Sequence, residues 1–129
     1  MQVHDIHPSE VEPVRQFLCA NGWAHRVGDA AQFAALLSNT QRTAIALNGA
    51  QILGFARGIT DGFSNGYLSM VVVSPPHQRR GIGSALVRHI TGDSSGVTWV
   101  LRAGREGAQE FFEKLGFSVS TVAMERRRV

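Results

Sequence analysis

The segment from Ser74 to Val87, SPPHQRRGIGSALV, constrains the fold of this chain more than any other stretch. It follows the apolar run MVVV, which is typical of a strand buried on both faces. It leads into a run from Gly81 to Ile90 whose apolar residues recur at helical spacing. A strand must therefore turn into a helix across a loop rich in arginine and glycine, which predicts a βα unit within a sheet.

The remaining periodicities extend this pattern along the whole chain. Helical spacing predicts further helices at 9–23, 29–39 and 107–117, and alternating apolar runs predict strands at 1–6, 43–59, 67–73, 97–103 and 118–126. Asn48-Gly49 divides the run at 43–59 into a hairpin of two strands. The order β-α-α-β-β-β-α-β-α-β predicts an α/β (α+β) fold, a mixed sheet with helices on its faces, in a single domain over residues 1–129.

Two helix starts carry specific signals. Ser9 and Glu12 have the spacing of a capping box, and Asp29 and Gln32 have the same spacing one helix later. We therefore expect the first helix to begin at Ser9 and the second to begin after Asp29.

Composition limits the classes of function. The chain has 129 residues and a net charge of +3, which the arginines at 126–128 alone account for, so a nucleic-acid-binding protein is disfavoured. The N-terminal residues do not resemble a secretory signal, and no run of apolar residues is long enough to cross a membrane. The one cysteine, Cys19, is expected to be a buried, inert thiol. We expect a cytoplasmic protein.

The loop before the helix at 81–90 has the chemistry of a diphosphate site. The first N–H groups of a helix have no partner within the helix, and the helix dipole favours an anion there. Gly81 and Gly83 would let phosphate oxygens approach the backbone, and Arg79 and Arg80 add positive charge at the rim. The dinucleotide fingerprint is incomplete because Leu86 stands in place of its third glycine or alanine, and the Gly-Lys-Ser/Thr of the P-loop is absent.

Two segments together resemble the GCN5-related N-acetyltransferases (GNAT). Gln78-Arg79-Arg80-Gly81-Ile82-Gly83 resembles the coenzyme A motif Q/R-x-x-G-x-G/A, and AQEFFEKLGF at 108–117 resembles the second motif of that family, A-x-x-F-Y-x-K-x-G-F. The resemblance spans about Leu53 to Phe117. It implies a mostly antiparallel mixed sheet with helices on both faces, and acetyl-coenzyme A as the acyl donor.

The resemblance also implies where the donor lies. The backbone N–H groups of the loop and helix start would bind the pyrophosphate. The pantetheine arm would pair with the strand before the loop, and the N–H of Val71 would bind the thioester carbonyl. The cofactor contacts implied in this way are Val71, Val72, Val73, Gln78, Arg79, Arg80, Gly81, Ile82, Gly83, Ser84, Phe111, Phe112 and Lys114.

The resemblance implies direct transfer of an acetyl group to a primary amine in a ternary complex, but the residues that would move protons differ. Phe112 stands where many members have a tyrosine acid, and Tyr67 stands where some have a glutamate base. Arg105 stands where an asparagine is common. Tyr67 and Asp61, together with the backbone of Val71, are the candidate catalytic groups. A thiolate is also a fair leaving group without an acid.

Three alternatives stay open at this point. The chain could be an acyl-coenzyme A-binding module without turnover, an interpretation that Phe112 supports. The acceptor could be a small molecule or a peptide, and Trp23 and Phe33 could either line its pocket or belong to the core. The chain could also form a homodimer.

No metal is expected, because His4 and His7, three apart on a strand, would point to opposite faces.

Overall fold

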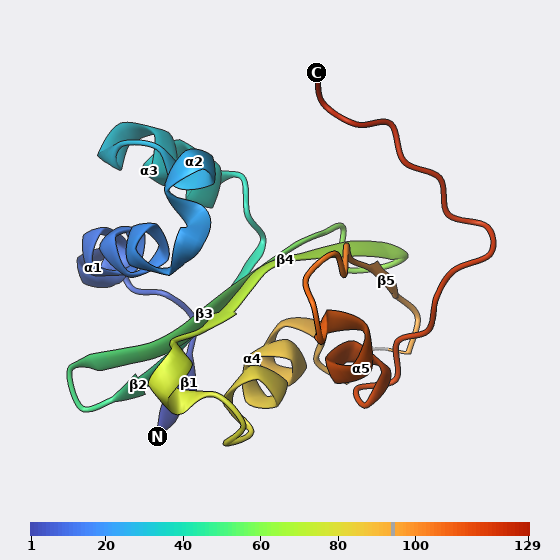
Figure 1. Ribbon diagram of the computed structural model, residues 1–129. Coiled ribbons are helices and arrows are strands. Elements are labelled where there is room, and N and C mark those ends of the chain that lie inside the picture. Colours follow the sequence, from blue (N-terminus) through green and yellow to red (C-terminus); the bar gives the residue numbers. More distant parts are fainter. Residues whose placement is uncertain (94) are drawn as a thin grey trace.

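The computed structural model describes residues 1–93 and 95–129 and shows a sheet with helices on both faces (Figure 1). In these residues the sheet has five strands in the order β1-β2-β3-β4-β5. The strands are β1 (Gln2–His4), β2 (Arg42–Asn48), β3 (Gln51–Thr60), β4 (Asn65–Val73) and β5 (Thr98–Val100). The α-helices are α1 (Val11–Leu18), α2 (Ala24–Val27), α3 (Ala30–Ser38), α4 (Ile82–Thr91) and α5 (Ala108–Glu113). Short 3-10 turns, η1 (Pro8–Glu10) and η3 (Pro75–His77), and the π-helical turn η2 (Cys19–Trp23) complete the elements.

The sheet is mostly antiparallel, as predicted. Strands β1 to β4 pair antiparallel with their neighbours, and only β5 runs parallel to β4. Asn48 pairs with Gln51 across the predicted hairpin turn, where Gly49 takes a positive φ of 60°. The parallel pair requires a crossover, which α4 supplies.

Each face of the sheet has its own apolar core. Figure 1 shows α1, α2 and α3 on one face and α4 and α5 on the other. On the α1–α3 face the largest buried side chains include Phe33 and Phe55, and Trp23 packs against this core. On the α4 face Leu86 and Ile90 are fully buried, and Phe111 and Phe112 pack at the margin. Phe33 therefore belongs to the core, one of the two roles left open for it.

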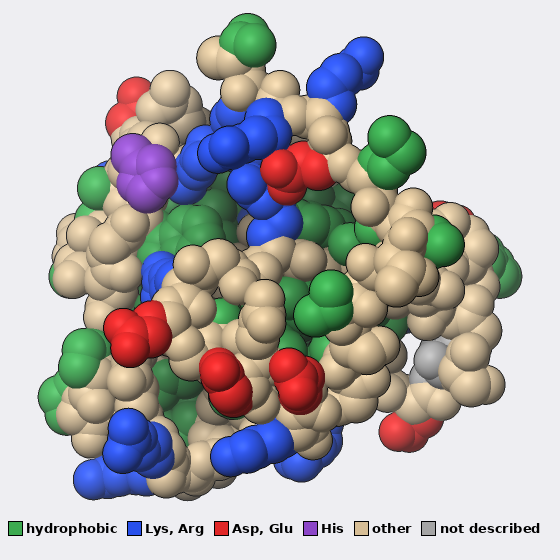
Figure 2. Space-filling model, turned by 45° about the vertical axis from the view of Figure 1, so that its right-hand side comes forward, with side chains coloured by type: hydrophobic (Ala, Val, Ile, Leu, Met, Phe, Trp, Pro, Cys, Tyr) green, Lys and Arg blue, Asp and Glu red, His purple; other side chains and the backbone are tan. Residues whose placement is uncertain are grey.

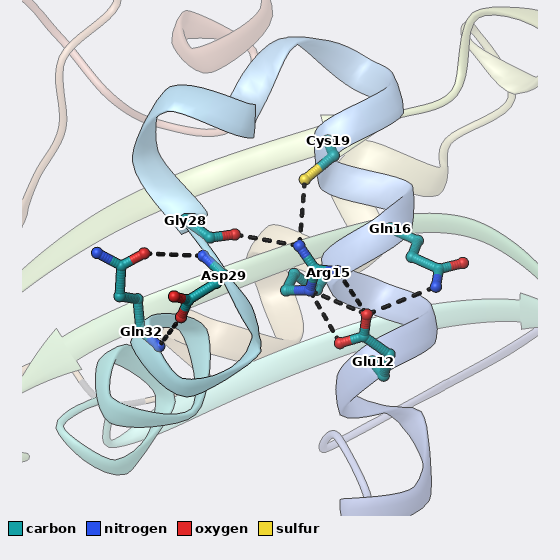
Figure 3. A network of polar contacts seen from close by, with 7 residues as sticks. All are labelled: Glu12, Arg15, Gln16, Cys19, Gly28, Asp29 and Gln32. Atoms are coloured by element: carbon teal, nitrogen blue, oxygen red, sulfur yellow. Dashed lines mark hydrogen bonds and ion pairs between the residues drawn. The ribbon is translucent and has the colours of Figure 1, made fainter.

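An arginine joins α1 to the turn before α3 (Figure 3). Arg15 bonds both carboxylate oxygens of Glu12, at distances down to 2.6 Å, and its Nη1 donates to the Gly28 carbonyl at 3.1 Å. Arg15 Nη1 also lies 4.0 Å from the sulfur of Cys19, whose thiol is free and only half-buried. The hydrogen bond from Arg15 lowers the pKa of Glu12, and the same bond raises the pKa of Arg15.

The predicted helix starts have different outcomes. Asp29 accepts the Gln32 N–H at 2.9 Å, and the Gln32 side chain accepts the Asp29 N–H at 2.8 Å, so this capping box is confirmed. The box predicted at Ser9 is wrong, because Pro8 opens the 3-10 turn η1 and the Glu10 carboxylate accepts the His7 N–H at 2.8 Å.

The expected separation of two histidines is also wrong. Strand β1 ends at His4, so the alternation of a strand does not extend to His7. The two rings stack with centroids 4.6 Å apart, and potential ligand atoms of His4, His7 and Glu10 lie within 4.8 Å of one another. This group lies at the β1 edge of the sheet, the edge opposite β5.

The strand predicted at 118–126 does not form. Its backbone has no strand assignment, and Val119, Val122 and Met124 are largely exposed. Figure 1 shows this segment leading away from the sheet toward the C-terminus. An alternating pattern stabilises a strand only when a neighbouring strand pairs with it, and in the described residues none pairs with this one.

None of the helices in the described part of the chain is long and apolar enough to span a membrane.

Candidate active site

Strand β4 pairs with β5 over only part of its length. Pairing with β5 ends at Tyr67, opposite Val100, while β4 continues to Val73. Over this second half β4 has a partner only in β3 among the described residues. One edge of the backbone from Val71 to Val73 is therefore available to a bound molecule, which is where the resemblance placed the pantetheine arm.

A bulge changes the direction of β4 just before this free edge. Phe55 pairs with Val72 and Arg57 pairs with Ser69, so β4 carries one residue more than β3 between these pairs. Met70 takes a φ of 55°, which is rare for a residue with a side chain. Such bulges bend a strand and are frequent beside active sites. No sequence pattern in MVVV indicated the bulge.

The loop after β4 ends at a helix start with free donors. Gly81, with φ 81°, precedes α4, and no side chain caps the helix. The first helical bond runs from the Ala85 N–H to the Gly81 carbonyl at 3.1 Å, so the N–H groups of Ile82, Gly83 and Ser84 have no acceptor within the helix. The backbone here has the form of the anion site that the sequence predicts.

The two glycines of the motif have different roles. A Cβ at Gly81 would meet no protein atom within 4 Å, and the positive φ explains the glycine. A Cβ at Gly83 would lie 2.9 Å from the ring of Phe111. Gly83 therefore allows α4 and α5 to pack closely, a role that the sequence did not predict, whereas Gly81 faces open space.

Replacing Gly83 tests this packing role. We expect Gly83→Val to destabilise the protein by about 1–3 kcal/mol, the usual cost of overpacking, because the Phe111 ring must move. Urea denaturation would measure the change. Gly104→Val is the matched control, since a Cβ at Gly104 meets nothing within 4 Å and its φ is not positive. Equal stability of the two variants would contradict the packing role.

The polar side chains of the loop hold its shape. Gln78 Nε2 donates to the Val73 carbonyl at 3.1 Å, so this side chain closes the loop onto the end of β4. Arg80 Nη1 lies 3.5 Å from Nδ1 of His77. Arg79 takes a φ of 65°, and both arginines are exposed. A positioning role for Gln78 and a charged rim at Arg79 and Arg80 agree with this geometry.

The second motif forms α5 and an aromatic cluster. The Phe112 ring lies 4.9 Å from that of Phe111 and 5.6 Å from that of Phe117, both edge to face. Phe111 contacts Gly83 in turn, so α5 packs beside the start of α4. Lys114 follows the last residue of α5 and is exposed. The cluster offers no proton donor at Phe112.

The Asp61 side chain accepts hydrogen bonds within the β3–β4 turn. Its Oδ1 accepts the N–H groups of Phe63 and Ser64 at 2.8 Å and of Asn65 at 3.2 Å, and its Oδ2 accepts the Ser64 hydroxyl at 2.6 Å. These bonds, the Ser64 hydroxyl first, lower the pKa of Asp61 far below its ordinary value. A carboxylate with both oxygens engaged is a weak base, so a turn-forming role explains Asp61 better than a catalytic one.

A substitution separates these two roles for Asp61. Asp61→Ala is expected to lower the melting temperature at neutral pH while changing kcat by less than about tenfold, below the usual contribution of a general base. Since the folded pKa is lowered, the stabilisation is present above the unfolded pKa of about 3.9 and is lost as pH falls. The difference in melting temperature between wild type and variant should therefore shrink under acid conditions. A loss of kcat of a hundredfold would restore Asp61 as a base.

Tyr67 lies at the point where β4 and β5 separate. It is half-buried and pairs with Ile59 of β3 as well as with Val100. With Gln41, Ile59 and Thr60 it lines an open hollow of about 510 Å³. The candidate proton carrier is thus next to the free edge of β4 and is accessible from solvent.

Two arginines on the α1–α3 side of the sheet were not predicted as part of an acceptor site. Arg57 of β3 pairs with Ser69, and its Nη1 donates to the Thr40 hydroxyl at 3.0 Å. The guanidinium of Arg105, in the loop before α5, stacks over the Trp23 ring at 5.4 Å. A charged residue within the otherwise apolar run GFARGI was the sequence signal for Arg57. The contact between Arg105 and Trp23 joins the loop before α5 to η2, which lies far away in the sequence.

Comparison with protein families places this geometry in context. The model of the acetyltransferase (GNAT) domain matches residues 39–119, which include β2 to α5 and the whole of the loop before α4. None of the curated proteins matches the sequence.

Solved structures share the fold over nearly the whole chain. A structure from Xanthomonas campestris assigned to the GNAT family has a TM-score of 0.78 at 20% identity, covering 99% of this chain and 94% of that one. A GNAT-family acetyltransferase from Streptococcus pneumoniae has a TM-score of 0.71 at 24% identity, covering 98% and 97%. The structure of AAC(6')-Iy with the bisubstrate analogue CoA-S-monomethyl-acetylneamine has a TM-score of 0.73 at 18% identity, covering 99% and 98%.

Proposed function

The chain belongs to the GNAT family of acetyltransferases, and from that premise we propose that it transfers an acetyl group from acetyl-coenzyme A to the primary amine of a small molecule or peptide. The observation that carries the proposal is the start of α4, where three N–H groups without helical partners follow the open Gly81. AAC(6')-Iy, which has the same fold, was solved with a coenzyme A bisubstrate analogue. That complex supports the choice of donor.

The residues present fit a coenzyme A ligand. The free N–H groups of Ile82, Gly83 and Ser84 would bind its pyrophosphate, since a helix start favours an anion. The free edge of β4 at Val71–Val73 would pair with the amide groups of the pantetheine arm in the manner of an added strand. Gln78 would hold the loop in place through its bond to the Val73 carbonyl.

Acetyl-coenzyme A would supply an activated acyl group whose C–S bond breaks as the amine nitrogen bonds to the carbonyl carbon. The N–H of Val71 would stabilise negative charge on the carbonyl oxygen, as a fixed backbone donor does in many acyl transfers. Tyr67 would take or relay the proton that the amine loses, because it is the tyrosine of the chain and lies where β4 and β5 part. Phe112 has no proton to give to the leaving thiolate, which would depart unaided or take a proton from water.

A coenzyme A-binding module without turnover is the second candidate. The aromatic cluster of Phe111, Phe112 and Phe117 favours it, because it occupies the place of the usual acid with apolar rings. Release of free thiol from acetyl-coenzyme A in the presence of a panel of amines would distinguish the two. Binding of the donor without thiol release for any amine would favour the module.

Donor binding is the first test of both candidates. We expect coenzyme A at a hundredfold excess over its Kd to raise the stability by about 2.7 kcal/mol, which thermal denaturation would detect as a higher melting temperature. Adenosine without the pyrophosphate is the matched control and should give little or no shift. Equal melting temperatures with and without millimolar coenzyme A would overturn the proposed donor.

A further inference from the structure

Arg57 is a half-buried cation that forms no ion pair among the described residues. It lies in the middle of β3, on the side of the sheet that carries Phe55 and the α1–α3 core. Its side chain is half-buried, its Nε is fully buried, and in the part of the chain that the structure describes its Nε bonds no acceptor. No carboxylate of residues 1–93 or 95–129 forms an ion pair with it. Burial lowers its pKa, which the nearby Tyr67 partly opposes, yet arginine stays charged in proteins.

Such an arrangement is costly for the protein alone. A buried charge is normally paired, because the loss of hydration is not repaid otherwise. The single bond of Arg57, from Nη1 to the Thr40 hydroxyl, does not supply a negative charge. A side chain that destabilises the free protein is typical of a site whose partner arrives with a ligand.

The free edge of the guanidinium fits a carboxylate. Thr40 accepts a bond from Nη1 and Nε is buried, which leaves the Nη2 edge as the part of the guanidinium that a carboxylate can reach. The single positive charge of the guanidinium would neutralise the single negative charge of one carboxylate. This edge belongs to the face of the sheet that carries Tyr67, since Ile59, the residue two beyond Arg57, pairs with Tyr67.

A second unpaired donor lies on the same face. The indole N–H of Trp23 is buried without an acceptor among the described residues, and Trp23 packs on the same core as Phe55 and Met70. The Arg105 guanidinium covers the Trp23 ring at 5.4 Å, which brings another positive charge to this side. Figure 2 shows a hollow with apolar side chains at its floor and Lys and Arg side chains gathered along one rim.

We infer that the acceptor is a small amine that also carries a carboxylate, and that Arg57 binds this carboxylate through its Nη2 atom. The inference rests on the proposed acetyl transfer, since it names the class of acceptor for the same site. Arg57 is then a specificity residue that holds the acceptor beside Tyr67.

Matched acceptors test the inference. α-Amino acids would be compared with their own carboxamides, with acetyl-coenzyme A as donor and free thiol as readout. A carboxylate beside an amine favours its protonated form, so the intrinsic reactivity at neutral pH favours the carboxamide. We nevertheless expect kcat/KM to be at least about tenfold higher for the carboxylates, as a charge-assisted hydrogen bond would give. Equal values, or a preference for the carboxamides, would overturn the inference.

Variants of Arg57 test whether this residue causes the preference for carboxylates over carboxamides. Arg57→Met should abolish it and leave the Kd for coenzyme A unchanged, while Arg57→Lys should keep part of it. Arg88→Met, which removes an exposed arginine from α4 on the opposite face, should behave as wild type. The melting temperature of Arg57→Met without ligand should be unchanged or higher, because an unpaired buried charge is removed. A lower melting temperature with an intact carboxylate preference would show that Arg57 is only structural.

Binding separates failure of the inference from failure of the proposed function. The shift in melting temperature caused by the same carboxylates and carboxamides would be measured with and without coenzyme A. Stabilisation by carboxylates in wild type but not in Arg57→Met supports the site even when no thiol is released, and the proposed transfer would then be the part that fails. Turnover of amines without any effect of Arg57→Met would keep the transfer and reject the carboxylate site.

Discussion

Replacing Gly81 by asparagine or by valine is expected to weaken coenzyme A binding at least about tenfold, equivalent to about 1.4 kcal/mol. The reason is geometric. A Cβ at Gly81 would meet no protein atom within 4 Å, and Gly81 directly precedes the free N–H groups of Ile82, Gly83 and Ser84. If the pyrophosphate binds these groups, any side chain at Gly81 comes close to it. Isothermal titration with coenzyme A would measure the loss.

The choice of two side chains separates crowding from backbone strain. Gly81 has a φ of 81°, a conformation that costs valine roughly 1–2 kcal/mol but that asparagine tolerates. Valine should therefore lose both stability and affinity, whereas asparagine should lose mainly affinity. Gly49→Asn is the matched control, since Gly49 also has a positive φ and open space around its Cβ but lies in the β2–β3 hairpin. Wild-type affinity of Gly81→Asn would move the pyrophosphate away from this helix start.

Local sequence signals predicted those parts of the fold in which neighbouring residues decide the structure. The capping box of Asp29 and Gln32, the hairpin at Asn48-Gly49 and the strand–loop–helix unit around Gly81 all depend on contacts within a few residues. Such contacts leave a pattern that can be read along the chain. The order of strands and helices up to α5 follows from them, except that the short helix α2 (Ala24–Val27) was not predicted.

Features that depend on distant partners could not be read in the same way. The segment 118–126 alternates like a strand, yet a strand requires a neighbour, and the sequence does not say whether one is available. The rings of His4 and His7 stack because β1 ends at His4 and the chain then turns into η1. Neither of the two residues between them indicated this change of direction.

The candidate site also combines features that depend on neighbouring residues with features that depend on distant ones. The loop before α4 was predicted from its own residues, and the structure gives it free N–H groups at Ile82, Gly83 and Ser84. The different reasons for Gly81 and Gly83 were not predicted, because Phe111 reaches Gly83 from a helix much later in the chain. Arg57 was missed because its importance lies in the absence of an ion-pair partner among the described residues, which only the packed sheet reveals.

Tyr67→Phe is expected to lower kcat at least about tenfold, since the low end for general acid–base catalysis is roughly a hundredfold and water can replace part of it. Tyr67 is half-buried at the last β4–β5 pair, and the competing candidate, Asp61, has both oxygens engaged in the β3–β4 turn. The hydroxyl is therefore the group on this side of the sheet that we assign to proton transfer. The removal of one oxygen should leave the strand and its pairing unchanged.

The pH dependence and the division between kcat and KM decide what Tyr67 does. A proton carrier should lower kcat and change the profile of kcat against pH, whereas a residue that only supports Arg57 should raise KM for the acceptor. Phe112→Tyr is the matched variant, because it adds a hydroxyl at the usual acid position within the cluster of Phe111 and Phe117. We expect it to keep the fold and to leave kcat unchanged or modestly raised. If Tyr67→Phe has wild-type kcat and an unchanged profile, bulk water must take the proton, and Tyr67 is part of the acceptor site alone.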